Sequence, residues 1–305
     1  MDLRLESFLA IIREGSYVKA AKSLSLSQPS VTYHIRQLER EYGIKIFYRN
    51  GNAQYLTGEG KILLQYAQRL ENLENRLRRE LTDAETQLTH LTVGITPTCS
   101  EALLGRVFTS YCSAHPETSI RVVTGSTEQL VRRIEDYALD FALLDGTVES
   151  KSCRVEHLDT DYLLVVMCPQ HPLACRDRVT LEELKKESLI LRSDEAGTRR
   201  LFEAGLIEHM DHIHNYDVRL EMDDLTSIKE LVMANLGVTI MAYSACREEI
   251  QAGRLYGAGI EGMNLQREIQ LVSGDAFDYP SILAEIRRLY ESLTQSALSD
   301  ASRAN

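Results

Sequence analysis

The polar residues with the clearest spacing lie near the N-terminus, between positions 28 and 37. Val31, Ile35 and Leu38 recur at the spacing of one helix face, which predicts a buried apolar stripe. The opposite face carries amide, hydroxyl, phenol and guanidinium groups, from Gln28, Ser30, Thr32, Tyr33, Arg36 and Gln37. On a helix lying in the major groove of DNA, such groups reach base edges and phosphates. Periodicity alone does not separate this reading from an ordinary packed helix with a solvated polar face.

A second group of polar residues, mostly hydroxyls, follows apolar segments that are typical of strands. Thr96 to Ser100 follow the segment 91–95, Ser126 and Thr127 follow 120–123, and Thr198 stands where a helix opens. Beyond the carboxyl ends of parallel strands, helix N-termini offer free N–H groups and a positive dipole end. These positions therefore predict binding of a small anion. For any single Ser or Thr before a helix, capping of that helix is the commoner role.

Three further patterns suggest chemistry but are weaker. The run from His209 to His214 contains imidazoles and a carboxylate, yet it lacks the spacing and the defined ligand set of a metal site, so a polar surface loop is expected. The pairs Asp145-Gly146 and Asp223-Asp224 have no neighbouring base or nucleophile, and are typical of turns and caps. The sequence therefore predicts neither an enzyme nor a bound cofactor or metal.

The six cysteines are spread through the chain without a Cys-x-x-Cys pair: Cys99, Cys112, Cys153, Cys168, Cys175 and Cys246. With no basic and apolar export signal at the start of the chain, we expect a cytoplasmic protein with free thiols, and no zinc. Cys99, near a helix N-terminus, is the one candidate for a reactive thiol, although a buried neutral thiol is the commoner case. No apolar stretch approaches the roughly 20 residues of a membrane span.

Charge is distributed unevenly along the 305 residues. The formal net charge of -11 argues against a nucleic-acid partner, but residues 1–60 hold eight Lys and Arg against six Asp and Glu. The remaining residues hold 26 against 39. An acidic body thus follows an N-terminal part that is compatible with phosphate contacts.

The N-terminal part reads as three short helices followed by a hairpin. A helix through Leu5 to Ile12 ends near Gly15, a second contains Ala20 and Ala21, and Ser27 is placed to cap the third. Segments 44–48 and 53–56 can pair across Arg49-Asn50-Gly51-Asn52, because Asn-Gly tolerates the backbone of a tight turn. Such a hairpin would be the wing of a winged helix-turn-helix.

The residues of this part resemble the LysR-type transcriptional regulators. The resemblance is carried by Phe8, Glu14-Gly15-Ser16, Ala20-Ala21, Leu24, Ser27 to Thr32, Ile35, Leu38-Glu39, Gly43, Phe47, Arg49, Leu56-Thr57 and Gly60. It implies a DNA-binding domain over residues 1–58, in which Gln28, Pro29, Ser30, Thr32, Tyr33 and Arg36 belong to the DNA-reading helix and Arg49 to the wing. Many relatives have a further basic residue in the wing, where this chain has Asn50, Asn52 and Gln54, so weaker wing contacts are expected.

Residues 60–88 contain no proline or internal glycine and predict one long helix. Leu63, Ala67, Leu70, Leu77, Leu81 and Leu88 fall largely on a heptad seam, and Glu74 interrupts it. A surface helix packed on its own body is the alternative. In the LysR family this segment, here 59–89, is the linker helix of a homodimer. We therefore expect a dimer, or a tetramer as is common in the family, on double-stranded DNA with an inverted repeat.

After Leu88, short strands alternate with helices in two sets, which predicts an α/β domain of two lobes over residues 90–305. Lobe I is expected at 90–165 and 266–295 and lobe II at 166–265, with segments 163–167 and 269–272 as crossing strands. This half resembles the periplasmic-binding-type effector domain of the same family. The resemblance implies a small-molecule effector bound between the lobes by Thr96, Thr98, Cys99, Ser100, Ser126, Thr127, Thr198 and Thr226. RNA polymerase would be a further partner if the protein activates transcription.

Overall fold

The computed structural model describes residues 1–51, 53–86, 88–99, 104–148, 150–275, 277 and 279–303. The chain forms two compact units. Met1–Leu88 with Asp136–Ala138 make the first, and Thr89–Glu135 with Leu139–Asn305 make the second. No helix among the described residues is long and apolar enough to cross a membrane.

The first unit begins with three helices, α1 (Leu3–Glu14), α2 (Tyr17–Ser23) and α3 (Gln28–Tyr42). The predicted cap of α3 is present, since the Ser27 hydroxyl accepts a hydrogen bond from the Ser30 N–H. Gly43 ends the helix at φ +64°. A left-handed residue at that place favours glycine, which has no β-carbon to clash. The helices pack on a shared core that includes Phe8, Ala20 and Leu38.

A two-stranded hairpin, β1 (Phe47–Asn50) and β2 (Ala53–Leu56), follows as the wing. The predicted first strand, at 44–48, is displaced toward the C-terminus. Before the hairpin, the Ile46 N–H donates to the Glu39 carboxylate, and the Ile46 carbonyl accepts from the Thr57 N–H. These bonds hold Ile46 in the helical core, so it cannot belong to the ladder.

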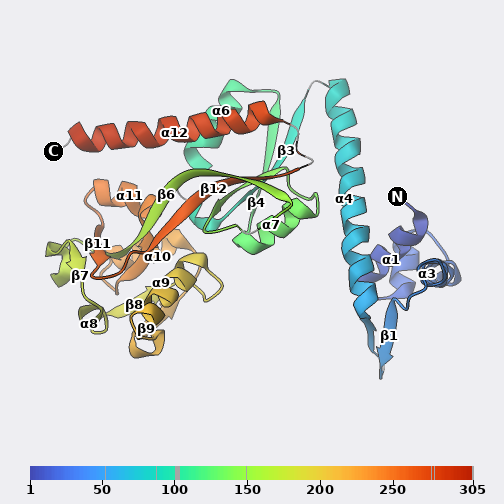
Figure 1. The fold of residues 1–305 in the computed structure, drawn as a ribbon, viewed down its shortest axis with the longest axis horizontal. Helices are drawn as coiled ribbons and strands as arrows, with labels where there is room; N and C mark the ends of the chain where they lie inside the picture. Colours follow the sequence, from blue (N-terminus) through green and yellow to red (C-terminus); the bar gives the residue numbers. More distant parts are fainter. Residues whose placement is uncertain are drawn as a thin grey trace. The chain divides into compact units, whose positions relative to one another are not determined.

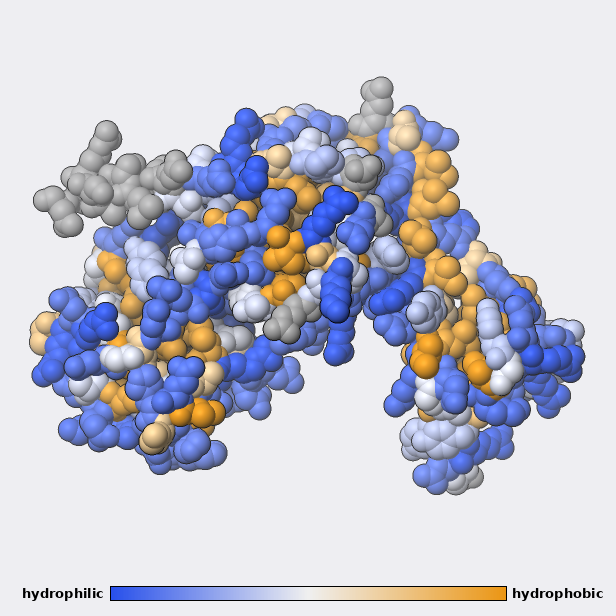
Figure 2. Space-filling view, viewed as in Figure 1, coloured by the Kyte–Doolittle hydropathy of each residue, from blue (hydrophilic) through white to orange (hydrophobic). Residues whose placement is uncertain are grey.

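The long helix is confirmed as α4 (Gly58–Thr86), but two residues of its predicted seam, Leu63 and Ala67, pack inside the unit. Ala67 is buried and Leu63 half-buried in the core of the same unit, and Glu74 forms an ion pair with the N-terminal ammonium of Met1. The exposed apolar face shares Leu70, Leu77 and Leu81 with the predicted seam, and it also includes Ile62, Tyr66 and Leu73. Figure 2 shows a hydrophobic strip along α4.

The second unit is built on a sheet in which strands run in the order β4-β3-β5-β12-β6-β11-β7, with β10 also paired to β6. Its strands are β3 (Thr89–Ile95), β4 (Thr118–Thr124), β5 (Phe141–Asp145), β6 (Cys153–Met167), β7 (Arg178–Val179), β10 (Thr239–Ala242), β11 (Tyr256–Ile260) and β12 (Gln266–Gly274). A separate parallel pair is formed by β8 (Ser188–Leu191) and β9 (Asp217–Glu221). The alternation of strand and helix predicted from the sequence is confirmed.

Two long strands, β6 and β12, run side by side between the two halves of this unit (Figure 1). The first part of β6 pairs with β12, and its last part, from Leu163 onward, pairs with β10 and β11. Its apolar end packs into the core of the second lobe, while Ile269 and Leu271 of β12 pack into the core of the first. The sequence predicted only the apolar end of β6, because residues 153–160 are mostly polar and form no apolar run.

Helices cover the strands of both lobes. The first lobe contains a π-helix (Leu104–Phe108), α6 (Thr109–Ala114), α7 (Thr127–Glu135) and α12 (Pro280–Arg303). The second contains α8 (Leu181–Leu184), α9 (Gly197–Glu208), α10 (Leu225–Met233) and α11 (Tyr243–Gln251). Short 3₁₀ turns occupy Pro172–Cys175 and Ile213–Asn215. In the described part of the segment between β3 and β4, the π-helix is followed directly by α6, and the domain limits stay a prediction.

Gly60 gives a direct test of how α4 joins the winged core. A β-carbon at this position would overlap the backbone carbonyl of Ile46, whereas Gly58 has open space around it. We expect Gly60→Ala to lower the free energy of unfolding by about 1–3 kcal/mol, as overpacking does. Gly58→Ala, the matched control, should stay within about 1 kcal/mol of wild type. Denaturant unfolding followed by circular dichroism measures both, and equal stability of the two variants would contradict the packing.

Candidate nucleic-acid and effector sites

A groove in the first unit lies between α3 and the wing. Its volume is about 300 Å³, and it is lined by Tyr17, Gln28, Thr32, Ile35, Arg36, Glu39, Phe47, Tyr48, Arg49 and Gln54. The Gln28 amide donates to the Thr32 hydroxyl at 3.0 Å, and that hydroxyl donates to the Gln28 carbonyl at 3.0 Å. Four of the DNA-binding residues predicted from the sequence thus share one groove: Gln28, Thr32, Arg36 and Arg49.

The other three predicted residues lie outside this groove. Pro29 and Tyr33 are exposed on α3, and Ser30 is half-buried. The Ser30 hydroxyl is 2.7 Å from the Ser27 hydroxyl, within the cap of the helix. Ser30 therefore contributes to the start of α3, while Tyr33 stays available to solvent on the polar face.

The wing contributes further exposed residues to this region that were not predicted from the sequence. Tyr48 and Tyr55 are directly opposite in the hairpin, both about half exposed, with ring centroids 5.7 Å apart. Gln54 donates to the Tyr17 hydroxyl at 3.2 Å and so ties the wing to α2. The sequence does contain a pattern that could have pointed to them, because Tyr48 and Tyr55 flank an Asn-Gly turn and alternate with polar residues.

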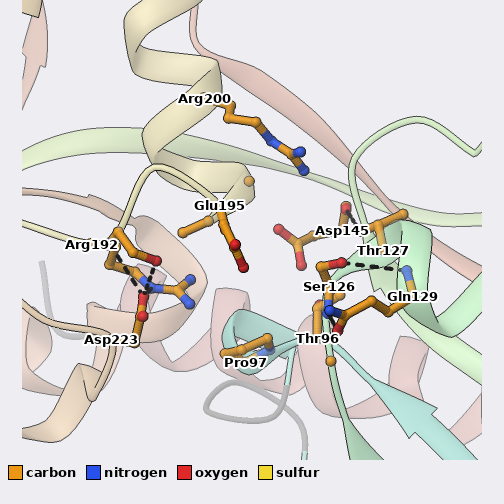
Figure 3. A pocket seen from close by; sticks show the side chains of 14 residues that line it. Thr96, Pro97, Ser126, Thr127, Gln129, Asp145, Arg192, Glu195, Arg200 and Asp223 are labelled. Carbon is orange, nitrogen blue, oxygen red and sulfur yellow. Dashed lines mark hydrogen bonds and ion pairs between the residues drawn. The ribbon is translucent and has the colours of Figure 1, made fainter. Parts of the chain in front are cut away.

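A cavity of about 230 Å³ in the second unit is lined from both lobes (Figure 3). The first lobe supplies Thr96, Pro97, Gly125, Ser126, Thr127, Gln129 and Asp145. The second supplies Arg192, Ser193, Glu195, Ala196, Gly197, Arg200 and Asp223. The cavity lies beyond the carboxyl ends of β3, β4 and β5, where the sequence placed the first-lobe hydroxyls.

Of the predicted effector-binding residues, Thr96, Ser126 and Thr127 line this cavity. Ser126 also caps α7, because its hydroxyl accepts from the Gln129 N–H at 3.3 Å, and the Thr127 hydroxyl donates to the Asp145 carbonyl at 2.9 Å. The Thr96 hydroxyl is buried and makes no regular hydrogen bond to the described residues. Capping and cavity lining therefore coincide at Ser126.

The structure does not bring Thr98, Cys99, Thr198 or Thr226 to the cavity wall. Thr98 and Cys99 are buried, Thr226 is exposed at the start of α10, and Ser100 lies outside the described residues. Burial raises the pKa of the Cys99 thiol far above its usual range. Cys99 therefore has neither the exposure nor the low pKa of a redox-reactive thiol. The described residues also contain no cluster of His, Cys, Asp or Glu suited to a metal ion, the 209–214 run included.

Ion pairs organise the charged side of the cavity. Arg192 lies 3.5 Å from Asp223, and Arg200 of the second lobe lies 2.9 Å from Glu128 of the first. Burial lowers the pKa of the Arg192 guanidinium, and Asp223 opposes that effect. The sequence reasoning missed these residues because their pairing joins segments that are far apart in the chain.

Arg267, at the start of β12, lies behind the cavity with its side chain almost fully buried. Its guanidinium donates to Asp145 and, at 3.1 Å, to Asp161, and it also contacts the Thr198 hydroxyl at 3.3 Å. Burial works against its charge, but the two carboxylates hold the pKa of Arg267 above its usual value. Asp161 in turn accepts from the Ser244 hydroxyl at 2.6 Å. One buried network thus joins β5 and the crossing strands to the starts of α9 and α11.

The start of α9 is open toward the cavity. Its N-cap residue, Ala196, has no polar side chain, and no other described side chain caps the first turn; both Ala196 and Gly197 line the cavity. The first N–H groups of an uncapped helix attract anions, since they lack intrahelical partners and stand at the positive end of the helix dipole. This helix end is the feature of the cavity that best suits a negatively charged group.

A winged helix-turn-helix followed by a two-lobed α/β unit with a cleft defines the ligand-responsive DNA-binding regulators. Residues 3–61 match the family of bacterial regulatory helix-turn-helix proteins of the lysR type, and residues 84–276 match the LysR substrate binding domain. The chain belongs to the LysR family. It is a transcriptional regulator with an effector-binding domain, and not an enzyme.

Relatives and solved structures agree with this membership. The chain is 26% identical over 288 residues to a probable RuBisCO transcriptional regulator of Thalassiosira pseudonana, covering 90% of this chain and 94% of that protein. It is 27% identical over 272 residues to the HTH-type transcriptional regulator CfxR of Cupriavidus necator, covering 87% and 82%. In fold it resembles the LysR family regulator CbnR, with a TM-score of 0.65 and 18% identity over 95% of this chain and 97% of that one. Full-length OxyR from Pseudomonas aeruginosa gives a TM-score of 0.63 and 20% identity over 94% and 93%.

The Arg267 network predicts a large effect of a single substitution. Arg267→Met would leave Asp145 and Asp161 buried without their counter-charge, so the free energy of unfolding should fall by about 3–5 kcal/mol. Arg287→Met is the matched control, because Arg287 pairs with Glu156 at 3.5 Å on an exposed helix face and should contribute at most about 1 kcal/mol. Urea unfolding at neutral pH compares them. A loss below about 1 kcal/mol for Arg267→Met would show that the network is not energetically important.

Proposed function

We propose that this regulator acts as a homodimer on inverted-repeat DNA, and that a small molecule with an anionic group, bound between the two lobes of each second unit, controls it. The observation that supports most of this proposal is the groove of the first unit, where Gln28, Thr32, Arg36 and Arg49 gather. Amide and hydroxyl groups on an exposed helix face suit base edges, and the two guanidinium groups suit phosphates or guanine.

The exposed face of α4 supports the dimer. Ile62, Leu70, Leu77 and Leu81 are each at least half exposed, and with Tyr66 and Leu73 they recur at intervals of three or four residues along one side of the helix. A contiguous apolar strip of this kind on a polar helix is typical of a helix that pairs with a second chain. The opposite side of α4 packs on the winged core through Ala67. A second copy of the chain is therefore the partner that best suits the exposed side. Two recognition helices related by a two-fold axis require a DNA site with matching symmetry.

The cavity between the lobes supports the effector. The open start of α9, the buried Thr96 hydroxyl and the Arg192 and Arg200 guanidinium groups offer donors to a carboxylate or phosphate. Because the cavity is lined from both lobes, a bound ligand changes the free energy of the closed relative to the open arrangement. Such a change can alter the spacing of the two recognition helices, or the bend of the DNA, and so couple ligand to operator.

Sequence-specific binding by α3 is tested by fluorescence anisotropy with inverted-repeat DNA and with scrambled DNA at two salt concentrations. We expect the Gln28→Ala, Thr32→Ala double variant to lose preference for the inverted repeat, because each base contact is worth about 1–3 kcal/mol, or roughly tenfold or more in affinity. Salt-dependent binding through phosphates should remain.

The control for this experiment removes the same side-chain types from an exposed face of α4. Gln68→Ala, Thr82→Ala should keep the wild-type preference. If the Gln28→Ala, Thr32→Ala variant still discriminates between the two duplexes as wild type does, α3 is not the base reader.

Dimerisation through α4 is tested by analytical ultracentrifugation. Leu70→Glu, Leu77→Glu should shift the protein toward monomer, because burying carboxylates in an apolar helix pair is strongly unfavourable. Leu236→Glu is the control, since Leu236 is similarly exposed but lies in the second unit. Unchanged sedimentation of the α4 variant would exclude this face as the dimer contact.

A further inference from the structure

The cavity between the lobes contains an acidic side chain that no described residue neutralises. Five charged side chains line the cavity: Asp145, Arg192, Glu195, Arg200 and Asp223. Both guanidinium groups have carboxylate partners, Asp223 and Glu128, and Asp145 is paired with Arg267. Within the described part of the chain, Glu195 is the one member of the five that makes neither an ion pair nor a hydrogen bond. Among the described residues, the lining therefore has one unpaired negative charge and no unpaired positive charge.

Glu195 lies on the segment that enters α9, immediately before the open N-cap residue Ala196. In Figure 3 its carboxylate is turned toward the cavity, as is that of Asp145. The Asp145 Oδ2 atom is 3.8 Å from the position that a β-carbon would take on Gly197, at the first turn of α9. Two carboxylates thus lie close to the same helix start that attracts an anionic group.

A ligand that carried only negative charge would be poorly matched to this arrangement. Like charges raise each other's free energy most where water is partly excluded, as in a cleft between lobes. A ligand with a cationic donor beside its acidic group would instead place the acid at the α9 N–H groups and the cation against Asp145 and Glu195. Charge-assisted hydrogen bonds of this kind are about twice as strong as neutral ones.

We propose that the effector is a small zwitterion of the α-amino-acid type. Its carboxylate binds the start of α9 and the Thr96 hydroxyl, and its ammonium group binds between Glu195 and Asp145. The cavity of about 230 Å³ suits a molecule of this size, since it is below the roughly 300–1,000 Å³ of sites for drug-sized ligands. An organic cation also fits better than a metal ion, because the described residues form no metal-binding cluster. This inference rests on the proposed function, in which the same cavity holds the effector.

The test uses the full-length protein and matched probes. Thermal unfolding is followed with each common α-amino acid, with the carboxylic acid that lacks its amino group, and with the amine that lacks its carboxyl group. A ligand that binds only the native state raises the Tm. We expect at least one amino acid to raise the Tm clearly more than its matched carboxylic acid or its matched amine. Isothermal titration then gives the affinity for that amino acid.

Glu195→Gln tests the assigned contact without removing a structural ion pair. Affinity for the amino acid should fall by roughly ten- to a hundredfold, as loss of a hydrogen bond to a charged group predicts. Affinity for the matched carboxylic acid should stay the same or increase, because a repelling charge has been removed. Asp194→Asn removes the same charge from the neighbouring exposed residue, which does not line the cavity, and should change neither affinity.

The outcomes separate this inference from the broader proposal. If the carboxylic acid binds as tightly as the amino acid, and Glu195→Gln does not weaken the amino acid, the zwitterion is wrong while an anionic effector still stands. If the amine alone stabilises the protein as well as the amino acid does, both the zwitterion and the anionic effector are wrong. Preferential binding of the amino acid that depends on Glu195, and not on Asp194, supports the inference.

Discussion

The buried guanidinium of Arg267 is the interaction on which the second unit depends. It stands at the start of β12, where the paired strands β6 and β12 pass between the lobes, and it contacts Asp145 and Asp161. An isolated charge at this depth would cost several kcal/mol, so the guanidinium and both carboxylates must stay together. Through Thr198 and Ser244 the same network reaches the first turns of α9 and α11. The crossing point of the two lobes is therefore a polar junction beside two apolar cores.

This junction also connects the cavity to the crossing strands. Asp145 is both a wall of the cavity and a partner of Arg267. A ligand that interacts with the Asp145 carboxylate therefore acts on the charge that holds the crossing strands and the start of α9 together. Allostery requires that the ligand bind one arrangement of the lobes more tightly than the other. Under the proposed function, Asp145 can provide this difference, since the same carboxylate contacts the ligand and holds the lobes.

In the first unit, α4 serves two purposes on two faces. Gly60 and Ala67 let one face approach the winged core closely, and the ion pair between Glu74 and the Met1 ammonium fixes the same side. The other face keeps its large apolar residues in solvent. A heptad pattern in the sequence does not tell which face packs inside the unit, because both faces contain apolar residues at helical spacing. Only the packed core shows which set is already buried.

The sequence by itself determined the family, the order of the elements and the face of α3 that is free to bind. Those features depend on local rules, such as the Ser27 cap, the Gly43 stop and the spacing of Val31, Ile35 and Leu38, and on a motif that is continuous in the chain. Tertiary structure decided which hydroxyls reach the cavity, that Thr198 contacts Arg267, and that Arg192, Glu195 and Arg200 line the cavity. Those charged positions come from lobes whose segments are distant in sequence, and their pairing follows from strand order and burial, which no local pattern encodes.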